Sequence, residues 1–181
     1  MTNGNRLVAI TGAPGAGKTT MLEHLAADGF ATMAEGARAI VREQVSIGGL
    51  AQPGLDSLLY AELMLNWEIR SFREASRLAG PVFFDRTVVD AIGYLMMIGE
   101  EVPHHFYEAA KQLRYDSTVI VAPFWPEIYL QDSERDSGPD QALRSCEFMC
   151  RAYEEVGYSL LVLPKVAVEE RVSLLRSHLQ T

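Results

Sequence analysis

The chain has little of what an exported, membrane-spanning or metal-clustering protein needs. Among its 181 residues are only two cysteines, Cys146 and Cys150, and four histidines, and they form no cluster with metal-ligand spacing. No apolar run approaches the roughly 20 residues that cross a bilayer. The N-terminus shows no basic region followed by an apolar core and a cleavage site. We therefore expect a soluble, cytoplasmic protein with reduced thiols.

Positive charge is also scarce. Lys and Arg number 16 against 24 Asp and Glu, which gives a formal net charge of -8. Such a surface repels polyanions, so nucleic acid and anionic membranes are disfavoured as partners and a small molecule is favoured. The length suits one domain that can bury a sheet between helix layers. Residues 1–181 are expected to form a single domain with one site.

Short apolar runs alternate with longer helical patterns along the chain. This alternation is typical of a parallel sheet with helices on both faces, which is a three-layer α/β fold. Several of the runs are continuously apolar, as expected for strands that are covered on both sides. The five predicted strands are Leu7–Thr11, Phe30–Ala34, Val82–Asp85, Thr118–Ala122 and Ser159–Leu163.

A long insertion at about residues 36–79 separates the second and third predicted strands. Its helical periodicity covers residues 36–46 and 55–79, with a Gly- and Pro-containing break between them. Ligands of open parallel α/β folds bind beyond the carboxyl ends of the strands, so this insertion can form the wall of a substrate pocket. Most of its apolar residues are expected to pack on the sheet. These residues are Leu55, Leu58, Leu59, Leu63 and Trp67.

The most specific motif begins at Gly12 and ends at Thr19. It reads GAPGAGKT, which matches GxxxxGK[ST] between an apolar strand and an amphipathic helix. With this composition, about 0.002 chance occurrences are expected. Glycines let the backbone curl so that its N–H groups face phosphate oxygens, and the helix N-terminus adds partial positive charge. The residues predicted to bind ATP are Gly12, Ala13, Pro14, Gly15, Ala16, Gly17, Lys18, Thr19 and Thr20.

Two further roles concern the phosphates and a magnesium ion. Lys18 is predicted to reach the β and γ phosphates and to act in catalysis, and the Thr19 hydroxyl is predicted to bind Mg²⁺. Asp85 ends an apolar strand, where a P-loop fold can place the acid that holds magnesium through a water. The alternative for Asp85 is a surface residue that caps the next helix.

Arg86 follows Asp85, where ATPase motors generally place a second acid that polarises a hydrolytic water. A cation there disfavours hydrolysis as the main purpose. Asp-Arg resembles the pattern of nucleoside and nucleotide kinases, whose Arg contacts the substrate or the transferred phosphoryl group. Arg86 is therefore predicted to be catalytic and to bind substrate.

Glu35 follows the second predicted strand, so it should emerge at the same edge of the sheet. A carboxylate there can orient a substrate hydroxyl and accept its proton in phosphoryl transfer. The alternative is an acid that stabilises a helix N-terminus. Arg38 can pair with Glu35 or bind substrate. Glu35 is predicted to be catalytic and, together with Arg38, to bind substrate.

A polar stretch at about residues 129–139 is the predicted lid. Arg135 is the only cation between Tyr129 and Pro139. It is predicted to close over ATP and to neutralise charge on the transferring phosphoryl group. A surface ion pair with a neighbouring Asp is the alternative.

Several segments in this order and spacing resemble the small AAA-labelled P-loop domain family. This family includes the ribosylnicotinamide kinase part of bacterial NAD-metabolism regulators. The resemblance implies a nucleoside/nucleotide-kinase-like fold with strand order 2-3-1-4-5. It also implies that ATP lies between the phosphate loop and the loop around Pro164 and Lys165. The segments are the phosphate loop, Ala34-Glu35-Gly36-Ala37-Arg38, Phe84-Asp85-Arg86, residues 129–135, Gly157–Pro164 and Glu169-Glu170-Arg171.

Three functions fit these residues. The first is a kinase that uses ATP and Mg²⁺ to phosphorylate a hydroxyl of a small, nucleoside-like metabolite. The second is an ATPase or nucleotide-dependent switch that acts on a protein partner. The third is a polynucleotide kinase, which the negative net charge disfavours.

Overall fold

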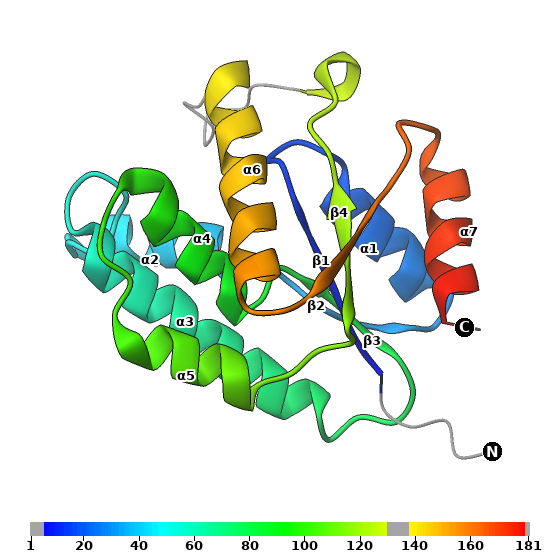
Figure 1. Ribbon diagram of the computed structural model, residues 1–181, viewed down its shortest axis with the longest axis horizontal. Helices are drawn as coiled ribbons and strands as arrows, with labels where there is room; N and C mark the ends of the chain where they lie inside the picture. The colour runs from blue at the N-terminus through cyan, green and yellow to red at the C-terminus, as the bar shows by residue number, and fades with distance from the viewer. Residues whose placement is uncertain (1–5, 130–137, 180–181) are drawn as a thin grey trace.

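A computed structural model of the chain describes residues 6–129 and 138–179 (Figure 1). Its centre is a five-stranded, all-parallel sheet with the order β2-β3-β1-β4-β5. The predicted α/β fold and strand order are therefore confirmed. The strands are β1 (Leu7–Gly12), β2 (Ala31–Met33), β3 (Val82–Asp85), β4 (Thr118–Ala122) and β5 (Ser159–Val162).

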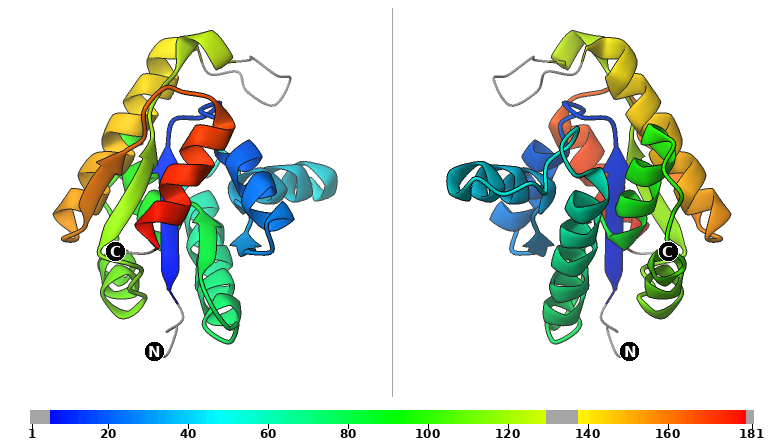
Figure 2. Two further views of the ribbon diagram at one scale, coloured as in Figure 1. Left: turned by 90° about the vertical axis from the view of Figure 1, so that its right-hand side faces the viewer. Right: turned by 90° about the vertical axis from the view of Figure 1, so that its left-hand side faces the viewer.

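Helices cover both faces of this sheet (Figure 2). One face carries α1 (Lys18–Ala27) and α7 (Val168–His178). The other face is covered by α3 (Ser57–Ala75), α4 (Val88–Ile98), α5 (His104–Gln112) and α6 (Pro139–Glu155). The remaining elements are α2 (Ala37–Ile47), which packs against α3, and a short 3-10 helix η1 (Pro126–Ile128) after β4.

The alternation of side chains along the strands explains their continuous apolar runs. Leu7 and Ala9 of β1 belong to the core cluster under α3 to α6, whereas Val8 and Ile10 belong to the cluster under α1 and α7. Successive side chains of a strand point to opposite faces, so both sets must be apolar when both faces are covered. At the sheet edge, the side chain of Val162 in β5 is largely exposed.

The prediction for the apolar residues of the insertion is only partly correct. Leu63 and Trp67 pack against the core, but Leu55, Leu58 and Leu59 are 66%, 45% and 43% exposed. Their spacing is helical, yet spacing alone does not say which face of a helix meets the core. The face of α3 that is buried carries Tyr60, Ala61, Met64 and Leu65.

Two other expectations concern the predicted lid and membrane-spanning helices. Most of the predicted lid, including Arg135, lies outside the described residues. Within residues 6–129 and 138–179, no helix is both long and apolar enough to cross a membrane.

Candidate functional site

A cleft of about 1550 Å³ opens at the carboxyl edge of the sheet. Its walls come from the phosphate loop, α2, the start of α3, the segment after β4 and the loop between β5 and α7. Six residues that were predicted from separate segments of the sequence meet in this cleft. They are Lys18, Thr19, Glu35, Arg38, Asp85 and Arg86.

The phosphate loop follows from local backbone requirements. Gly12 has φ 126, and a Cβ at this position would lie 2.0 Å from the carbonyl oxygen of Ala122, so only glycine fits. The next residue, Ala13, donates its N–H to that carbonyl at 3.0 Å. Gly17 caps α1 in the left-handed region (φ 82) and supplies no side-chain cap. The first N–H groups of α1 therefore have no side-chain acceptor from this cap and suit an anion.

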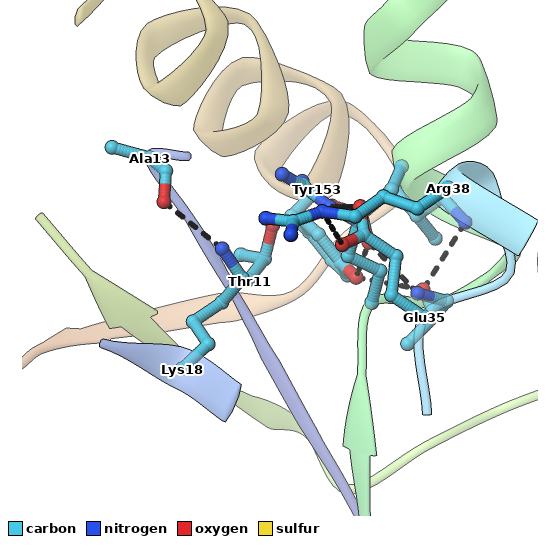
Figure 3. A network of polar contacts seen from close by, with 10 residues as sticks. Thr11, Ala13, Lys18, Glu35, Arg38 and Tyr153 are labelled. Carbon is cyan, nitrogen blue, oxygen red and sulfur yellow. Dashed lines mark hydrogen bonds and ion pairs between the residues drawn. The ribbon is translucent and has the colours of Figure 1, made fainter. Parts of the chain in front are cut away.

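Lys18 is buried at the start of α1. Its Nζ donates a hydrogen bond to the Ala13 carbonyl at 2.9 Å (Figure 3). Burial lowers the pKa of Lys18, and the Arg86 charge acts in the same direction, while Asp85 and Glu35 oppose them. A buried amine that is held by one neutral carbonyl is well placed to exchange this partner for phosphate oxygens.

Asp85 ends β3 inside the cleft and supplies an oxygen without a partner. Its Oδ1 is buried and has no hydrogen-bond partner among the residues described. Burial raises the pKa of Asp85, and the charge of Lys18 opposes this effect. The Thr19 hydroxyl lines the same cleft. One carboxylate and one hydroxyl fit Mg²⁺, which takes few protein oxygens and completes its shell with waters and substrate phosphates.

Arg86 is the one non-glycine residue of the described chain with a left-handed backbone, at φ 71. This conformation costs about 1–2 kcal/mol for a residue with a Cβ. It aims the guanidinium between two acids: Nε donates to Oε1 of Glu35 at 2.7 Å, and Nη1 donates to Oδ1 of Asp90 at 3.0 Å. Burial lowers the pKa of Arg86, but Glu35 and Asp90 outweigh it and leave the pKa raised. Strain of this kind is concentrated at functional sites.

Glu35 lies between two arginines. Besides the bond from Arg86, Nε of Arg38 is 4.0 Å from Oε2 of Glu35 (Figure 3). Burial raises the pKa of Glu35, but the charges of Arg86 and Lys18 outweigh burial and leave the pKa below its usual value. The carboxylate is therefore ionised at neutral pH and is fixed in orientation at the wall of the cleft.

Asp90 is a buried residue of this site that sequence analysis missed. It accepts hydrogen bonds from Oγ1 of Thr11 at 2.5 Å, the backbone N–H of Thr87 at 2.8 Å and Oη of Tyr153 at 2.6 Å. Thr87 and Asp90 also form the capping box of α4. The spacing of Thr87 and Asp90 alone predicts a helix N-terminal cap. The contacts with Arg86 and with Tyr153, which lies 63 residues further on, depend on the tertiary fold.

The loop between β5 and α7, around Pro164 and Lys165, was predicted to lie next to ATP, and the end of this loop borders the cleft. Val166, Ala167 and Val168 line the cleft, whereas the side chain of Pro164 is exposed. The Pro164 carbonyl accepts a hydrogen bond from Nε of Arg171 at 2.9 Å. Thr20 is exposed and lines the cleft near the start of α1.

The fold and its phosphate loop define a P-loop protein with a nucleoside/nucleotide-kinase-like architecture. A family model described as AAA domain matches residues 7–171, so the chain belongs to this AAA domain family. The family resemblance inferred from the sequence is thus confirmed. No curated protein matches the chain at a significant level.

Solved structures share the fold at low sequence identity. Deoxyadenosine kinase from M. mycoides with bound dATP has a TM-score of 0.66 and 15% identity over 98% of this chain and 100% of its own. Thymidylate kinase from Ehrlichia chaffeensis has a TM-score of 0.65 and 14% identity, again over 98% and 100%. NadR protein in complex with NR has a TM-score of 0.71 and 17% identity over 98% of this chain and 52% of its own. These identities establish likeness of fold.

Proposed function

We propose that the protein is a kinase that transfers the γ-phosphoryl group of ATP to a hydroxyl of a small, nucleoside-like metabolite. The observation that carries this proposal is the Glu35–Arg86 pair, at 2.7 Å, in the same cleft as Lys18 and Asp85. A hydrolase would benefit from a second acid after Asp85. This chain instead places a cation there. It pairs the cation with a carboxylate that can accept a hydrogen bond, and then the proton, from the hydroxyl of the acceptor.

On the donor side, the phosphate loop and Lys18 would hold the β and γ phosphates. Thr19 and Asp85 would hold Mg²⁺. The Oδ1 of Asp85 is buried without a hydrogen-bond partner among the described residues, so it is free to act as a metal ligand. When bound, the ion would neutralise charge on the phosphate oxygens. The raised pKa of Asp85 reflects the cost of keeping this carboxylate ionised without such a partner.

On the acceptor side, Glu35 orients the hydroxyl and accepts its proton. The acceptor oxygen forms a bond to the γ phosphorus while the bond from that phosphorus to the β–γ bridging oxygen breaks, and ADP leaves. A carboxylate with a low pKa is adequate here, because catalysis of phosphoryl transfer depends mainly on positioning and charge stabilisation. Arg86, held by Glu35 and Asp90, supplies a fixed positive charge to the transferring group.

The cleft has room for two substrates. Its volume of about 1550 Å³ exceeds the range of roughly 300–1,000 Å³ that is typical of a single-ligand pocket. Ala37, Val41 and Tyr60 line it on the side of α2 and α3, and Trp125 and Ile128 line it after β4. These apolar and aromatic side chains suit a ring-bearing acceptor. Deoxyadenosine kinase and thymidylate kinase, which share the fold, also support a ring-bearing acceptor.

A nucleotide-dependent switch is the second candidate, and one surface feature favours it. Large apolar side chains are exposed around the connection from α2 to α3, next to the cleft. Clustered exposed apolar residues often mark protein-interaction sites. The cluster consists of Val45, Ile47, Leu50, Leu55, Leu58 and Leu59.

The experiment that tests the proposed function is an ATP-consumption assay with Mg²⁺ and a panel of nucleosides, ribosylnicotinamide, sugars and amino alcohols. A kinase gives ADP and a phosphorylated product with one class of compound, and the Lys18→Ala variant does not. If ATP binds but no compound stimulates turnover, the kinase proposal fails and the switch takes its place. Capture of protein partners in the presence and absence of ATP would then be the next measurement.

Replacing Glu35 by glutamine should lower kcat with the identified acceptor by about 10²–10³, in the range of general base catalysis. Glutamine keeps the size of the side chain but cannot accept the proton. The dissociation constant for ATP, measured by calorimetry, should stay within about threefold, because the residue acts on the acceptor side. Glu62→Gln is the matched control, since Glu62 pairs with His105 and does not line the cleft. An unchanged kcat for Glu35→Gln would remove Glu35 from the mechanism.

Removing magnesium should abolish nucleotide-induced stabilisation. With ATP and Mg²⁺ the wild-type unfolding temperature should rise, and excess EDTA or the Asp85→Asn substitution should suppress most of this rise. Without ligands Asp85→Asn should be at least as stable as the wild type, because burial raises the pKa of Asp85 and disfavours its charge in the folded state. Asp28→Asn serves as a control outside the cleft. Full stabilisation of Asp85→Asn by ATP and Mg²⁺ would contradict the assignment of Asp85.

A further inference from the structure

Arg171 connects two walls of the cleft. It lies in the first turns of α7 and is only 2% exposed. Its Nη1 donates to the carbonyl of Ala16 at 2.8 Å, and its Nε donates to the carbonyl of Pro164 at 2.9 Å. One guanidinium therefore connects the phosphate loop with the loop between β5 and α7.

The third nitrogen of this guanidinium lacks a partner. Nη2 of Arg171 is buried without a hydrogen-bond partner among the described residues, although Arg171 lines the cleft. Arginine has five N–H donors, and leaving a buried donor unmet costs about 1–3 kcal/mol, more for a charged group. A ligand in the cleft can supply the missing acceptor.

The charge of Arg171 is also uncompensated. It makes no ion pair with an acid of residues 6–129 or 138–179, and its two direct partners are neutral carbonyls. Burial alone lowers the pKa of Arg171. A buried cation without a counter-charge is unfavourable, so an anion that enters the cleft gains from it.

Two neighbours locate this charge relative to the phosphate loop. A Cβ at Gly17 would lie 3.6 Å from Nη1 of Arg171, so the guanidinium lies beside the N-terminus of α1. On another side, its central carbon lies 5.1 Å from the ring centroid of Trp125, a cation–π contact that keeps the group in place. The charge thus lies at the meeting point of the phosphate loop and the wall after β4.

We propose that Arg171 is an anion-binding residue of the donor site that donates Nη2 to a phosphate oxygen of the bound nucleotide. It adds a second fixed cation to the phosphate cradle, beside Lys18. It also holds the Ala16 and Pro164 carbonyls in one geometry, so that both loops are already placed when the nucleotide binds. This inference rests on the proposed nucleotide binding and is independent of which acceptor is phosphorylated.

The test is calorimetric titration of Arg171→Met and Arg171→Lys with ATP, with tripolyphosphate and with adenosine, all in the presence of Mg²⁺. Methionine keeps much of the apolar stem without the charge, and lysine keeps the charge without the planar fork. Arg171→Met should weaken ATP and tripolyphosphate alike, by about 10- to 30-fold, as expected for a lost hydrogen bond to a charged group. Arg171→Lys should lie between Arg171→Met and the wild type, and adenosine binding should change little.

A matched control is Arg114→Met. Arg114 is also stacked on an aromatic ring, at 3.9 Å from the Tyr158 centroid, and also donates to a backbone carbonyl, that of Val156. It does not line the cleft, so its replacement should leave both dissociation constants unchanged.

The outcomes separate this inference from the proposed function. If wild-type protein binds neither ATP nor tripolyphosphate, the proposed function itself fails. If both bind in a Lys18-dependent manner and Arg171→Met binds them equally well, only the role of Arg171 is overturned. Loss of ATP and adenosine binding with tripolyphosphate unaffected would also overturn it, because the contact would then be to the nucleoside. Should Arg171→Met not fold, the same comparison is made with Arg171→Lys, for which a common weakening of about 3- to 10-fold is expected.

Discussion

ATP turnover should fall by at least about 10²-fold when Lys18 is replaced by alanine, comparable to the loss of one preorganised charge at a transition state. Lys18 is the cation of the phosphate loop and already lies buried against the Ala13 carbonyl at 2.9 Å. Burial lowers its pKa in the folded state, so the charged amine costs more free energy in the folded protein than in the unfolded chain. Removing the amine should therefore leave the free energy of unfolding unchanged or slightly increased.

Steady-state ATP consumption and chemical denaturation of the same samples measure both effects. Lys111→Ala is the control, because Lys111 is 69% exposed and its ion pair is with the surface residue Glu108. Surface substitutions of this kind usually change stability by less than about 0.5 kcal/mol. Wild-type turnover in Lys18→Ala would contradict nucleotide binding on this loop, whereas a collapse in stability would show that Lys18 is structural.

Asp90→Ala should have the largest effect on stability, a loss of about 3–5 kcal/mol in the free energy of unfolding. The substitution deprives buried Arg86 of one of its two acids and leaves the Thr11 hydroxyl without its acceptor. It also removes the capping box of α4 and one bond of the Tyr153 hydroxyl. Urea denaturation monitored by circular dichroism gives the difference directly.

Two milder substitutions divide this effect into parts. Tyr153→Phe removes two hydrogen bonds, one to Asp90 and one to the Thr87 hydroxyl, and should cost about 1–2 kcal/mol. Asp90→Asn keeps the shape and one acceptor oxygen, so its loss should lie between those of Tyr153→Phe and Asp90→Ala. A loss below about 1 kcal/mol for Asp90→Ala would show that the network is not a major source of stability.

Features with a local signal could be predicted from the sequence. Continuous apolar runs gave the strands, because strands covered on both faces cannot be polar on either. The phosphate loop was recognisable because a curled backbone requires glycine at fixed positions. Asp85 ends a predicted strand, and Glu35 and Arg86 directly follow predicted strands. The carboxyl ends of parallel strands meet at one edge of the sheet. Their convergence in one cleft follows from that topology.

Features that depend on contacts between distant segments could not be predicted. Arg171 occurs in a charged run with Glu169 and Glu170, a pattern typical of a solvated helix face. Only the packing of α7 brings Arg171 into contact with the phosphate loop. Asp90 was recognisable as part of a helix cap, but its bond from Tyr153 required the placement of α6. The exposed Leu58 of α3 has the spacing of a core residue, and its environment depends on what lies beside that face.

The two sides of the cleft are anchored very differently, and this difference matters for how such proteins diversify. α2 buries only Ile40, whereas α4 buries most of its first two turns and contributes Asp90, which pairs with Arg86. Mutations on the exposed face of α2 should therefore be tolerated during evolution, while those at the start of α4 should be removed by selection. Under the proposed function, a lineage could change its acceptor by altering α2 alone and keep the proposed phosphate-binding side intact.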